Sequence, residues 1–336
     1  MAAPCLTILV IVHSRLGDAI LSSGVITRLA ELHPQARFTI VASALTAPLF
    51  AHTPGLDQVI VLEKRRLGSH WIALLFELGL RRWGLIVDLR GAPITAMFNH
   101  RRRLVHRPSS RAEHKVVETA RLLGATSEPP APFLYTSLDI EARARALTQG
   151  CGPILAIAPR TNWIGKTWPA ERFAWVAREL LGREGPLAGG RLMVVGGPRD
   201  RRDALPVLSA VPKERVIDLV GREDLLVLFS ALKHARLFIG GDSGLTHMAA
   251  AAGARTLALF GPSDENIYAP WGPRSRTVRG ARSFAEFKRI DPRLDLALCH
   301  MMDLRPETVL AAAAELLTET QTRSTTTASP ADSQEP

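Results

Sequence analysis

Apolar runs and amphipathic stretches alternate along the first half of this 336-residue chain. Short apolar runs indicate buried strands, and apolar residues spaced three and four apart indicate helices. The pattern predicts strands at Leu6–Val12, Phe38–Ala42, Val59–Leu62 and Leu85–Val87, and helices over Asp18–Leu32, near Trp71–Leu80 and near Glu113–Leu123. Strands that alternate with helices build βαβ units, so we expect a mostly parallel sheet.

A second series of the same kind follows a polar, proline-rich stretch at 126–137, which is typical of a linker or a sheet edge. It predicts strands at Ile154–Ile157, Leu192–Val195, Val216–Leu219, Leu237–Ile239 and Thr256–Phe260, and helices over Glu171–Leu181, Leu225–Leu232, Leu245–Ala252 and Pro306–Thr318. Two successive α/β units predict two lobes with a cleft between them. Ligands of such sheets bind at the carboxyl ends of the strands.

The expected domains are a first lobe over residues 1–145, a second lobe over 150–303 and a C-terminal helix over 304–319. Residues 320–336 are rich in Ser, Thr, Ala, Pro and Gln, so we expect a disordered tail. No stretch of about 18 residues is apolar throughout, and no basic segment precedes the first apolar run. The sequence therefore predicts neither a membrane-spanning helix nor a signal peptide.

The net charge of +10 fits an anionic partner, namely nucleic acid, a membrane surface or a phosphorylated substrate, although a generally basic composition would also produce it. Aromatic residues make up 6% of the chain and are not interleaved with basic ones, which argues against a stacking surface for nucleic acid. The three cysteines are far apart and form no CxxC pair. This spacing indicates a reducing compartment and argues against a zinc site.

The strongest local feature is the segment Phe238–His247, which reads FIGGDSGLTH. A strand ends there, small residues turn the chain, and a helix opens at Ser243 and Gly244. The free N–H groups and positive dipole end of such a helix bind anions, and glycine lets a phosphate approach the backbone. Asp242 would cap the helix or orient these amides, and His247 faces the same side as Ser243. A capped helix with a hydrogen-bonded histidine is the structural alternative.

In each series, a further candidate turn follows the first strand. Residues 14–18, Ser-Arg-Leu-Gly-Asp, lead from strand to helix. A carboxylate at Asp18 is placed to act as a general base in the cleft, or only to cap the helix. In the second series, residues 158–169 place Lys166 on a loop before a helix that begins with proline. A loop lysine is a mobile cation suited to a diphosphate, and a solvated lysine is the alternative.

These turns, in this order, resemble those of the ADP-heptose:lipopolysaccharide heptosyltransferases, glycosyltransferase family 9. The resemblance runs from about Leu6 to about Leu317. Its markers are SRLGDA from Ser14, IVDLRG from Ile86, KTWPAERF from Lys166, and DSGLTH from Asp242, continuing to FGPSD from Phe260. Four motifs in order are specific to the family, but they are not specific to one acceptor.

The resemblance implies an α/β protein with the GT-B fold, in which two Rossmann-like lobes hold the acceptor mainly in the first and the donor in the second. It implies inverting transfer of a heptose from ADP-heptose to the lipopolysaccharide core, with a lipid A–Kdo or heptose acceptor. No cofactor or metal is expected, which fits the absence of any Asp-x-Asp sequence. The expected location is the cytoplasm, in peripheral contact with the inner membrane, and nucleic acid is not an expected partner.

By position, Asp18 matches the family's proposed base, and Lys166 matches the lysine proposed to neutralise the leaving diphosphate. The residues that match donor contacts are Thr161, Asp242, Ser243, Gly244, Leu245, Thr246 and His247. Those expected at the acceptor are Ser14, Arg15, Gly17, Arg65, Arg66 and Arg111.

One position departs from the family pattern. Leu226 stands where family members often have an acidic ribose contact, so either Glu223 or Asp224 replaces that contact or the ribose is held differently. A transferase for another sugar nucleotide or another acceptor therefore remains an alternative. A non-catalytic nucleotide-sugar binding protein would not need both Asp18 and Lys166. A dinucleotide dehydrogenase is disfavoured because no GxGxxG follows the first strand.

Overall fold

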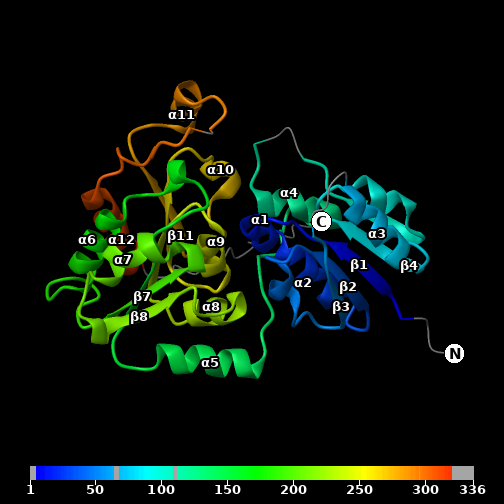
Figure 1. Cartoon of the computed structure of the whole chain (residues 1–336), viewed down its shortest axis with the longest axis horizontal. Coiled ribbons are helices and arrows are strands. Elements are labelled where there is room, and N and C mark those ends of the chain that lie inside the picture. The colour runs from blue at the N-terminus through cyan, green and yellow to red at the C-terminus, as the bar shows by residue number, and fades with distance from the viewer. Residues whose placement is uncertain (1–4, 64–67, 109–111, 295, 320–336) are drawn as a thin grey trace, which may run out of the picture.

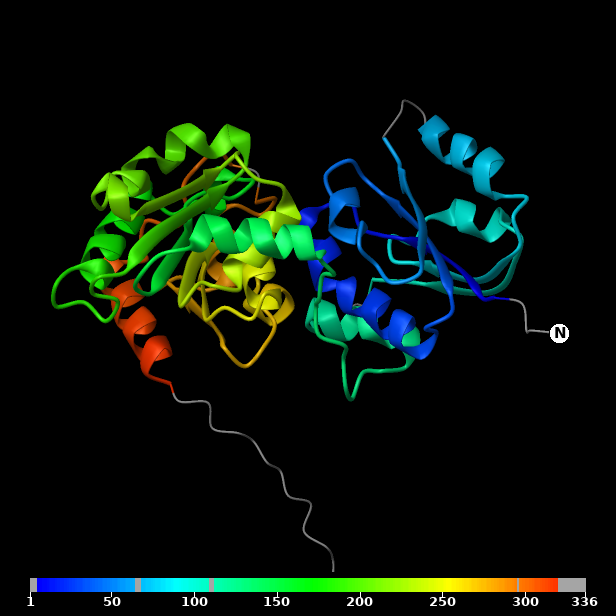
Figure 2. The ribbon, with the colours of Figure 1, turned by 90° about the horizontal axis from the view of Figure 1, so that it is seen from below.

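The computed structural model describes residues 5–63, 68–108, 112–294 and 296–319. They form two parallel sheets that lie side by side, each with helices on its faces (Figures 1 and 2). The expected α/β architecture of two Rossmann-like lobes, the GT-B arrangement, is confirmed. In this part of the chain, no helix is both long and apolar enough to cross a membrane.

The first sheet has the strand order β3-β2-β1-β4-β5. Its strands are β1 (Thr7–Ile11), β2 (Arg37–Ala42), β3 (Leu56–Val61), β4 (Trp83–Asp88) and β5 (His100–Val105). The helices of this lobe are α1 (Leu16–Leu21), α2 (Ser23–Leu32), α3 (Ser69–Leu78) and α4 (Lys115–Ala120). Alternate residues of β1 face opposite ways: Ile8 joins the core that contains α2, and Leu9 joins the core that contains α3.

The second sheet has the strand order β11-β10-β9-β6-β7-β8. Its strands are β6 (Ile154–Ala158), β7 (Arg191–Gly196), β8 (Val216–Val220), β9 (Leu237–Gly241), β10 (Thr256–Phe260) and β11 (Ser275–Arg279). Its helices are α5 (Leu138–Thr148), α6 (Ala170–Leu181), α7 (Arg201–Leu208), α8 (Leu225–Leu232), α9 (Gly244–Ala251), α10 (Glu265–Tyr268), α11 (Phe284–Ile290) and α12 (Pro306–Thr318). Phe229 of α8 packs on one face, and Phe173 of α6 packs on the other.

The predicted helix over Asp18–Leu32 is two helices that meet at Ser22. The Ser22 hydroxyl donates to the backbone oxygen of Asp18 at 2.8 Å. A serine that bonds to the preceding turn in this way bends a helix. The strands β5 and β11 were not predicted, because each lies at a sheet edge and carries arginines where a buried strand would carry apolar residues.

The chain crosses between the lobes before α5, which lies below the second lobe in Figure 1 and in front of it in Figure 2, the view from below. α5 packs along α8, and Lys233 next to α8 donates to Glu141 at 2.6 Å. The expected boundary at residue 145 falls inside this helix. We therefore propose a division of the chain just before Leu138.

Candidate active site

A cavity of about 1160 Å³ lies between the two lobes. The first lobe contributes the turn after β1 and residues near Ala44 and Pro48, and the second contributes the turns after β6, β7, β8, β9 and β10. These turns follow the carboxyl ends of parallel strands, where ligands of such sheets bind. In Figure 1, α1 of the first lobe lies beside α9 of the second, at the lobe boundary.

The turn from β9 into α9 presents amide donors to the cavity. Ser243 is the N-cap residue, in an extended conformation with φ −153° and ψ 166°. Its hydroxyl lies 3.4 Å from Oγ1 of Thr246, which donates to the backbone oxygen of Gly241 at 2.5 Å. The first N–H groups of a helix have no partner within it, and Ser243, Gly244 and Leu245 line the cavity. The turn therefore has the unpaired helix-start amides beside the cavity that the sequence predicts, and such amides suit an anion.

The carboxylate of Asp242 lies buried at the centre of a polar network. Its Oδ2 accepts from Nζ of Lys166 and from Oγ of Ser263, both at 2.7 Å, and its Oδ1 lies 3.6 Å from Nε2 of His247. Burial alone would raise the pKa of Asp242. The contact with His247 and the charge of Lys166 outweigh burial and hold this pKa well below its usual range. Asp242 is ionised and joins the turns after β6, β9 and β10.

His247 is buried one turn into α9. Its Nε2 faces Asp242, whereas its Nδ1 is buried and has no hydrogen-bond partner in the described part of the chain. Buried ring nitrogens normally have a partner. Since His247 lines the cavity, its imidazole is placed to meet a polar group of a ligand there.

Thr161 shapes the loop that carries Lys166. Its hydroxyl donates to the backbone oxygen of Trp163 at 2.8 Å and lies 2.9 Å from the hydroxyl of Thr167. A Cβ on Gly241 would lie 2.7 Å from its methyl group. Thr161 also lines the cavity, but its hydroxyl is engaged by these hydrogen bonds within the loop.

Asp18 faces the cavity from the first turn of α1. Among the described residues, no hydrogen bond or ion pair engages its carboxylate. The charge of Asp18 also acts on Tyr268 in α10 of the opposite lobe. Burial raises the pKa of Tyr268, and the charge of Asp18 raises it further. A carboxylate that lies open to the cavity is available to accept a proton from a bound hydroxyl.

Two glycines let the lobes touch. A Cβ on Gly244 would lie 2.6 to 2.8 Å from side-chain atoms of Leu16, and a Cβ on Gly17 would lie 3.1 Å from Cδ2 of His247. The sequence predicts room for a phosphate beside Gly244, but Leu16 of the opposite lobe occupies that side. The part of Gly244 that faces a ligand is therefore its backbone N–H.

The residues expected at the acceptor fall into two groups. Ser14 and Arg15 are exposed and line the cavity, and Gly17 lines it where α1 meets α9. Arg65, Arg66 and Arg111 lie outside the described residues.

Position 226 cannot supply a polar contact to a ribose, because it is a leucine of α8 that is buried in the core. Glu223 accepts from Arg143 at 2.5 Å, so its carboxylate is engaged. Asp224 lines the cavity at the N-cap position of α8, without a side-chain cap. Both acidic residues line the cavity, and of the two, in the described part of the chain, only the carboxylate of Asp224 has no side-chain partner.

Sequence reasoning did not assign Ser263, Tyr268 or His13. Ser263 belongs to the FGPSD marker, which was a usable signal, whereas no motif points to Tyr268. His13 directly precedes the SRLGDA turn, and its Nε2 is buried with no hydrogen-bond partner in the described ranges. Burial lowers the pKa of His13 to about 4, although the charge of Asp18 opposes this. Its ring centroid lies 5.8 Å from that of His106.

The adjacent Cys299 and His300 have protein partners. Sγ of Cys299 contacts the backbone oxygen of Thr167 at 3.2 Å, and Nε2 of buried His300 lies 3.4 Å from Oδ2 of Asp291. The described residues contain no group of three or more His, Cys, Asp or Glu side chains that could hold a metal ion.

Comparisons with known proteins agree with this geometry. The family profile described as glycosyltransferase family 9 (heptosyltransferase) matches residues 56–297. Lipopolysaccharide heptosyltransferase 2 of Salmonella typhimurium is 24% identical over 93% of this chain and 99% of its own length. The solved E. coli ADP-heptose lipopolysaccharide heptosyltransferase II has a TM-score of 0.71 at 20% identity and covers 93% of this chain and 98% of its own. A family 9 glycosyl transferase from Veillonella parvula has a TM-score of 0.74 at 21% identity, over 94% and 98%.

Proposed function

This chain belongs to glycosyltransferase family 9, the heptosyltransferases, and we propose that it transfers a heptose from ADP-heptose to the inner core of lipopolysaccharide with inversion and without a metal. One observation carries the proposal. The open amides of α9 and the ammonium of Lys166 lie on one side of the cavity, and the free carboxylate of Asp18 lines the other. The anion site and the base thus flank the space for a reacting sugar.

The leaving group is the diphosphate of the nucleotide. As the bond between the anomeric carbon and the diphosphate oxygen breaks, the electron pair leaves with ADP. The positive end of α9 and Lys166 stabilise this developing charge, as a metal ion does in other enzymes. Asp242 holds Lys166 and His247 in place through its buried network.

The nucleophile is a hydroxyl of the acceptor. Asp18 takes its proton, the hydroxyl oxygen forms the new bond to the anomeric carbon, and attack from the face opposite the diphosphate inverts that carbon. General-base assistance of this kind contributes about 10² to 10⁴ in rate. Arg15 and Ser14 at the rim, with Arg65, Arg66 and Arg111, are proposed to hold the anionic acceptor.

The proposed acceptor is part of a membrane lipid, and one surface of the first lobe suits a membrane. Ile72, Phe76 and Leu80 recur every fourth residue on and just beyond α3 and are 54%, 81% and 94% exposed. Exposed arginines follow at Arg81 and Arg82. An apolar stripe beside basic residues fits an anionic leaflet, so we propose peripheral contact with the cytoplasmic face of the inner membrane.

Flotation with phosphatidylglycerol vesicles tests this contact. The variant Phe76→Ser/Leu80→Ser should bind vesicles less than the wild type does. Leu138→Ser is the matched control, because Leu138 is 88% exposed on α5. Equal loss in both variants would contradict a role specific to α3.

A thermal-shift titration with ADP, UDP, GDP and CMP, with and without magnesium, tests the donor. A ligand that binds only the folded protein raises its melting temperature. A shift selective for ADP and independent of magnesium supports the proposal, and transfer from ADP-heptose to Kdo-lipid A then tests the acceptor. A shift selective for UDP or GDP would indicate that the donor is another sugar nucleotide. This alternative stays open because buried Leu226 stands where family members often have the acidic ribose contact.

A further inference from the structure

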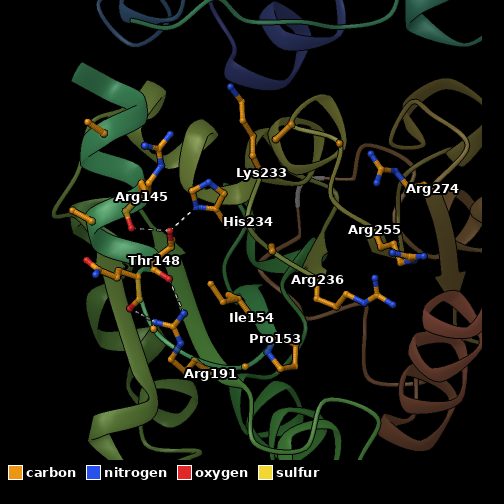
Figure 3. A pocket seen from close by; sticks show the side chains of 18 residues that line it. Arg145, Thr148, Pro153, Ile154, Arg191, Lys233, His234, Arg236, Arg255 and Arg274 are labelled. Atoms are coloured by element: carbon orange, nitrogen blue, oxygen red, sulfur yellow. Dashed lines mark hydrogen bonds between the residues drawn. The ribbon is translucent and has the colours of Figure 1, made fainter. Parts of the chain in front are cut away.

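A second cavity, of about 890 Å³, lies at the amino edge of the second sheet, opposite the cleft. Figure 3 shows it lined by the starts of strands and the ends of helices, with Pro153 and Ile154 between two groups of basic side chains. Arg145 and Arg191 lie on one side, and the other side holds a row of three arginines.

The row follows from the sheet topology. Arg236, Arg255 and Arg274 each stand one residue before a strand, namely β9, β10 and β11, which are neighbours in the sheet. Neighbouring strands are about 4.8 Å apart, so the three side chains begin at that spacing. Lys233 completes the basic lining, and no Asp or Glu of the described residues lines the cavity.

Most of these cations have no counter-charge. Lys233 pairs with Glu141 at 2.6 Å. Arg191 donates to the backbone oxygens of Thr148 and Gln149 at 2.6 and 2.8 Å, but its Nε is buried without a partner in the described structure. Within the same residues, no ion pair or side-chain hydrogen bond engages the remaining four guanidinium groups, those of Arg145, Arg236, Arg255 and Arg274.

The arginines also repel one another. Burial lowers the pKa of Arg255, and the charges of Arg236 and Arg274 lower it further, whereas the charge of Glu319 opposes this shift. Two glycines make room for the guanidinium groups: a Cβ on Gly150 would lie 2.8 Å from Nη1 of Arg191, and one on Gly253 would lie 2.9 Å from Nη2 of Arg274. The like charges around the cavity therefore repel one another and lower the stability of the folded protein. A bound anion would reduce this repulsion.

Helix ends offset only part of this charge. α5, α8 and α9 end at the cavity, which is lined by Thr148 of α5 and by the C-cap residues of the other two, Lys233 and Ala252. Each helix end carries about −0.5 charge, roughly −1.5 in all. Together with Glu141, this leaves the six cations in excess by roughly 3.5 charges.

We propose that this cavity binds an anion that carries phosphate groups, either a free phosphorylated solute or the headgroup of a phospholipid. Several guanidinium groups around one cavity match phosphate oxygens through paired N–H donors. The site is separate from the cleft, since β6 and β9 each run from the basic cavity to the cleft. The proposal does not depend on the transferase reaction.

Calorimetric titration with inorganic pyrophosphate tests the proposal on the full-length protein. Because pyrophosphate also suits the cleft, the titration uses the Lys166→Ala background without added nucleotide, since ADP would compete for the same basic cavity. Arg236→Glu/Arg274→Glu should weaken pyrophosphate binding by about tenfold or more. Arg178→Glu/Arg183→Glu is the control, because it changes the net charge equally at two exposed arginines of the same lobe outside the cavity. Circular dichroism checks folding, and Arg255→Gln/Arg274→Gln repeats the test without charge reversal.

A second arm uses phosphatidylglycerol vesicles. Weaker pyrophosphate binding with vesicle binding equal to the control identifies a free solute. Vesicle binding that falls below that of the control identifies a lipid headgroup. If the cavity variants bind pyrophosphate and vesicles as well as the control does, the proposal is wrong. This holds even if they unfold at a lower temperature, because the arginines would then only stabilise the C-terminal ends of the helices.

Discussion

Nζ of Lys166 lies 2.7 Å from Oδ2 of Asp242, and this pair joins the loop after β6 to the turn after β9. The sequence suggests a mobile loop cation, but the structure holds it in a network with Ser263 and His247. One buried carboxylate thus sets the positions of the cation, the imidazole and the helix start that face the cleft.

Removal of either partner should have a different effect. Lys166→Ala should weaken ADP binding about tenfold and lower kcat about 10² to 10³-fold, because a positive charge at the leaving group is lost. Asp242→Asn should cost about 2 to 4 kcal/mol of unfolding free energy, because it leaves a partly buried cation without its counter-charge. Urea unfolding and ADP titration of both variants check this. Unchanged ADP affinity in Lys166→Ala would contradict the diphosphate role.

Asp18→Asn should keep donor binding and lose turnover. The amide has nearly the same shape as the carboxylate but cannot accept the proton, so we expect kcat to fall by about 10² to 10⁴. ADP affinity should stay within about twofold, since the open amides that line the phosphate site belong to the other lobe. Steady-state kinetics and thermal shift measure the two effects. Turnover near the wild-type rate would remove Asp18 as the base.

Gly244→Ala should push the lobes apart at α1 and α9. The added Cβ would lie 2.6 Å from Cγ of Leu16, and overpacking of this kind costs about 1 to 3 kcal/mol. Leu16→Ala removes that Cγ, so the double variant should recover part of the loss. A double-mutant cycle on unfolding free energy measures the coupling. Strictly additive effects would show that the two residues do not press on each other.

Asp224→Asn should weaken ADP binding more than Glu223→Gln does. Both residues line the cavity, but the carboxylate of Glu223 is already paired with Arg143. Loss of one hydrogen bond to a charged acceptor corresponds to about 1.5 to 3 kcal/mol, or at least tenfold in affinity. Adenine binding without ribose should change little in either variant. The reverse ranking would assign the ribose contact to Glu223.

Elements with strong periodicity could be predicted from the sequence because burial dictates their composition. β1 and β9 read as continuous apolar runs and are buried along almost their whole length. β5 was missed because His100-Arg101-Arg102-Arg103 at a sheet edge can face solvent on one side. α5 was missed for a similar reason: charged residues alternate with alanines along much of it, and only Ala144 and Thr148 of its 11 residues are buried.

The site was predictable where motifs end strands and unpredictable where it depends on contacts between the lobes. Asp18, Lys166 and Asp242 all line the cleft, because the carboxyl ends of parallel strands meet at one edge of each sheet. The contact of Gly244 with Leu16 depends on how the lobes pack, and no local pattern encodes it. The same holds for Tyr268, whose pKa is raised by the charge of Asp18 across the cleft.

His13 should make the protein lose stability as the pH falls through weakly acidic values. Its pKa is about 4 in the folded protein and 6.5 in its ordinary state, because burial opposes the charged form. Between pH 6.5 and pH 4 the unfolded chain binds more protons at this site than the folded protein does. The contribution of neutral His13 to the free energy of unfolding is therefore complete above pH 6.5 and decreases as the pH falls to 4. Below pH 4 it changes no further. The difference between pH 6.5 and pH 4 is on the order of 3 kcal/mol. Urea unfolding of wild type and His13→Gln at pH 7 and pH 4.5 measures it, with exposed His52→Gln as the control. His13→Gln should lose less stability than the other two proteins, and an equal loss in all three would show that His13 is not the titrating group.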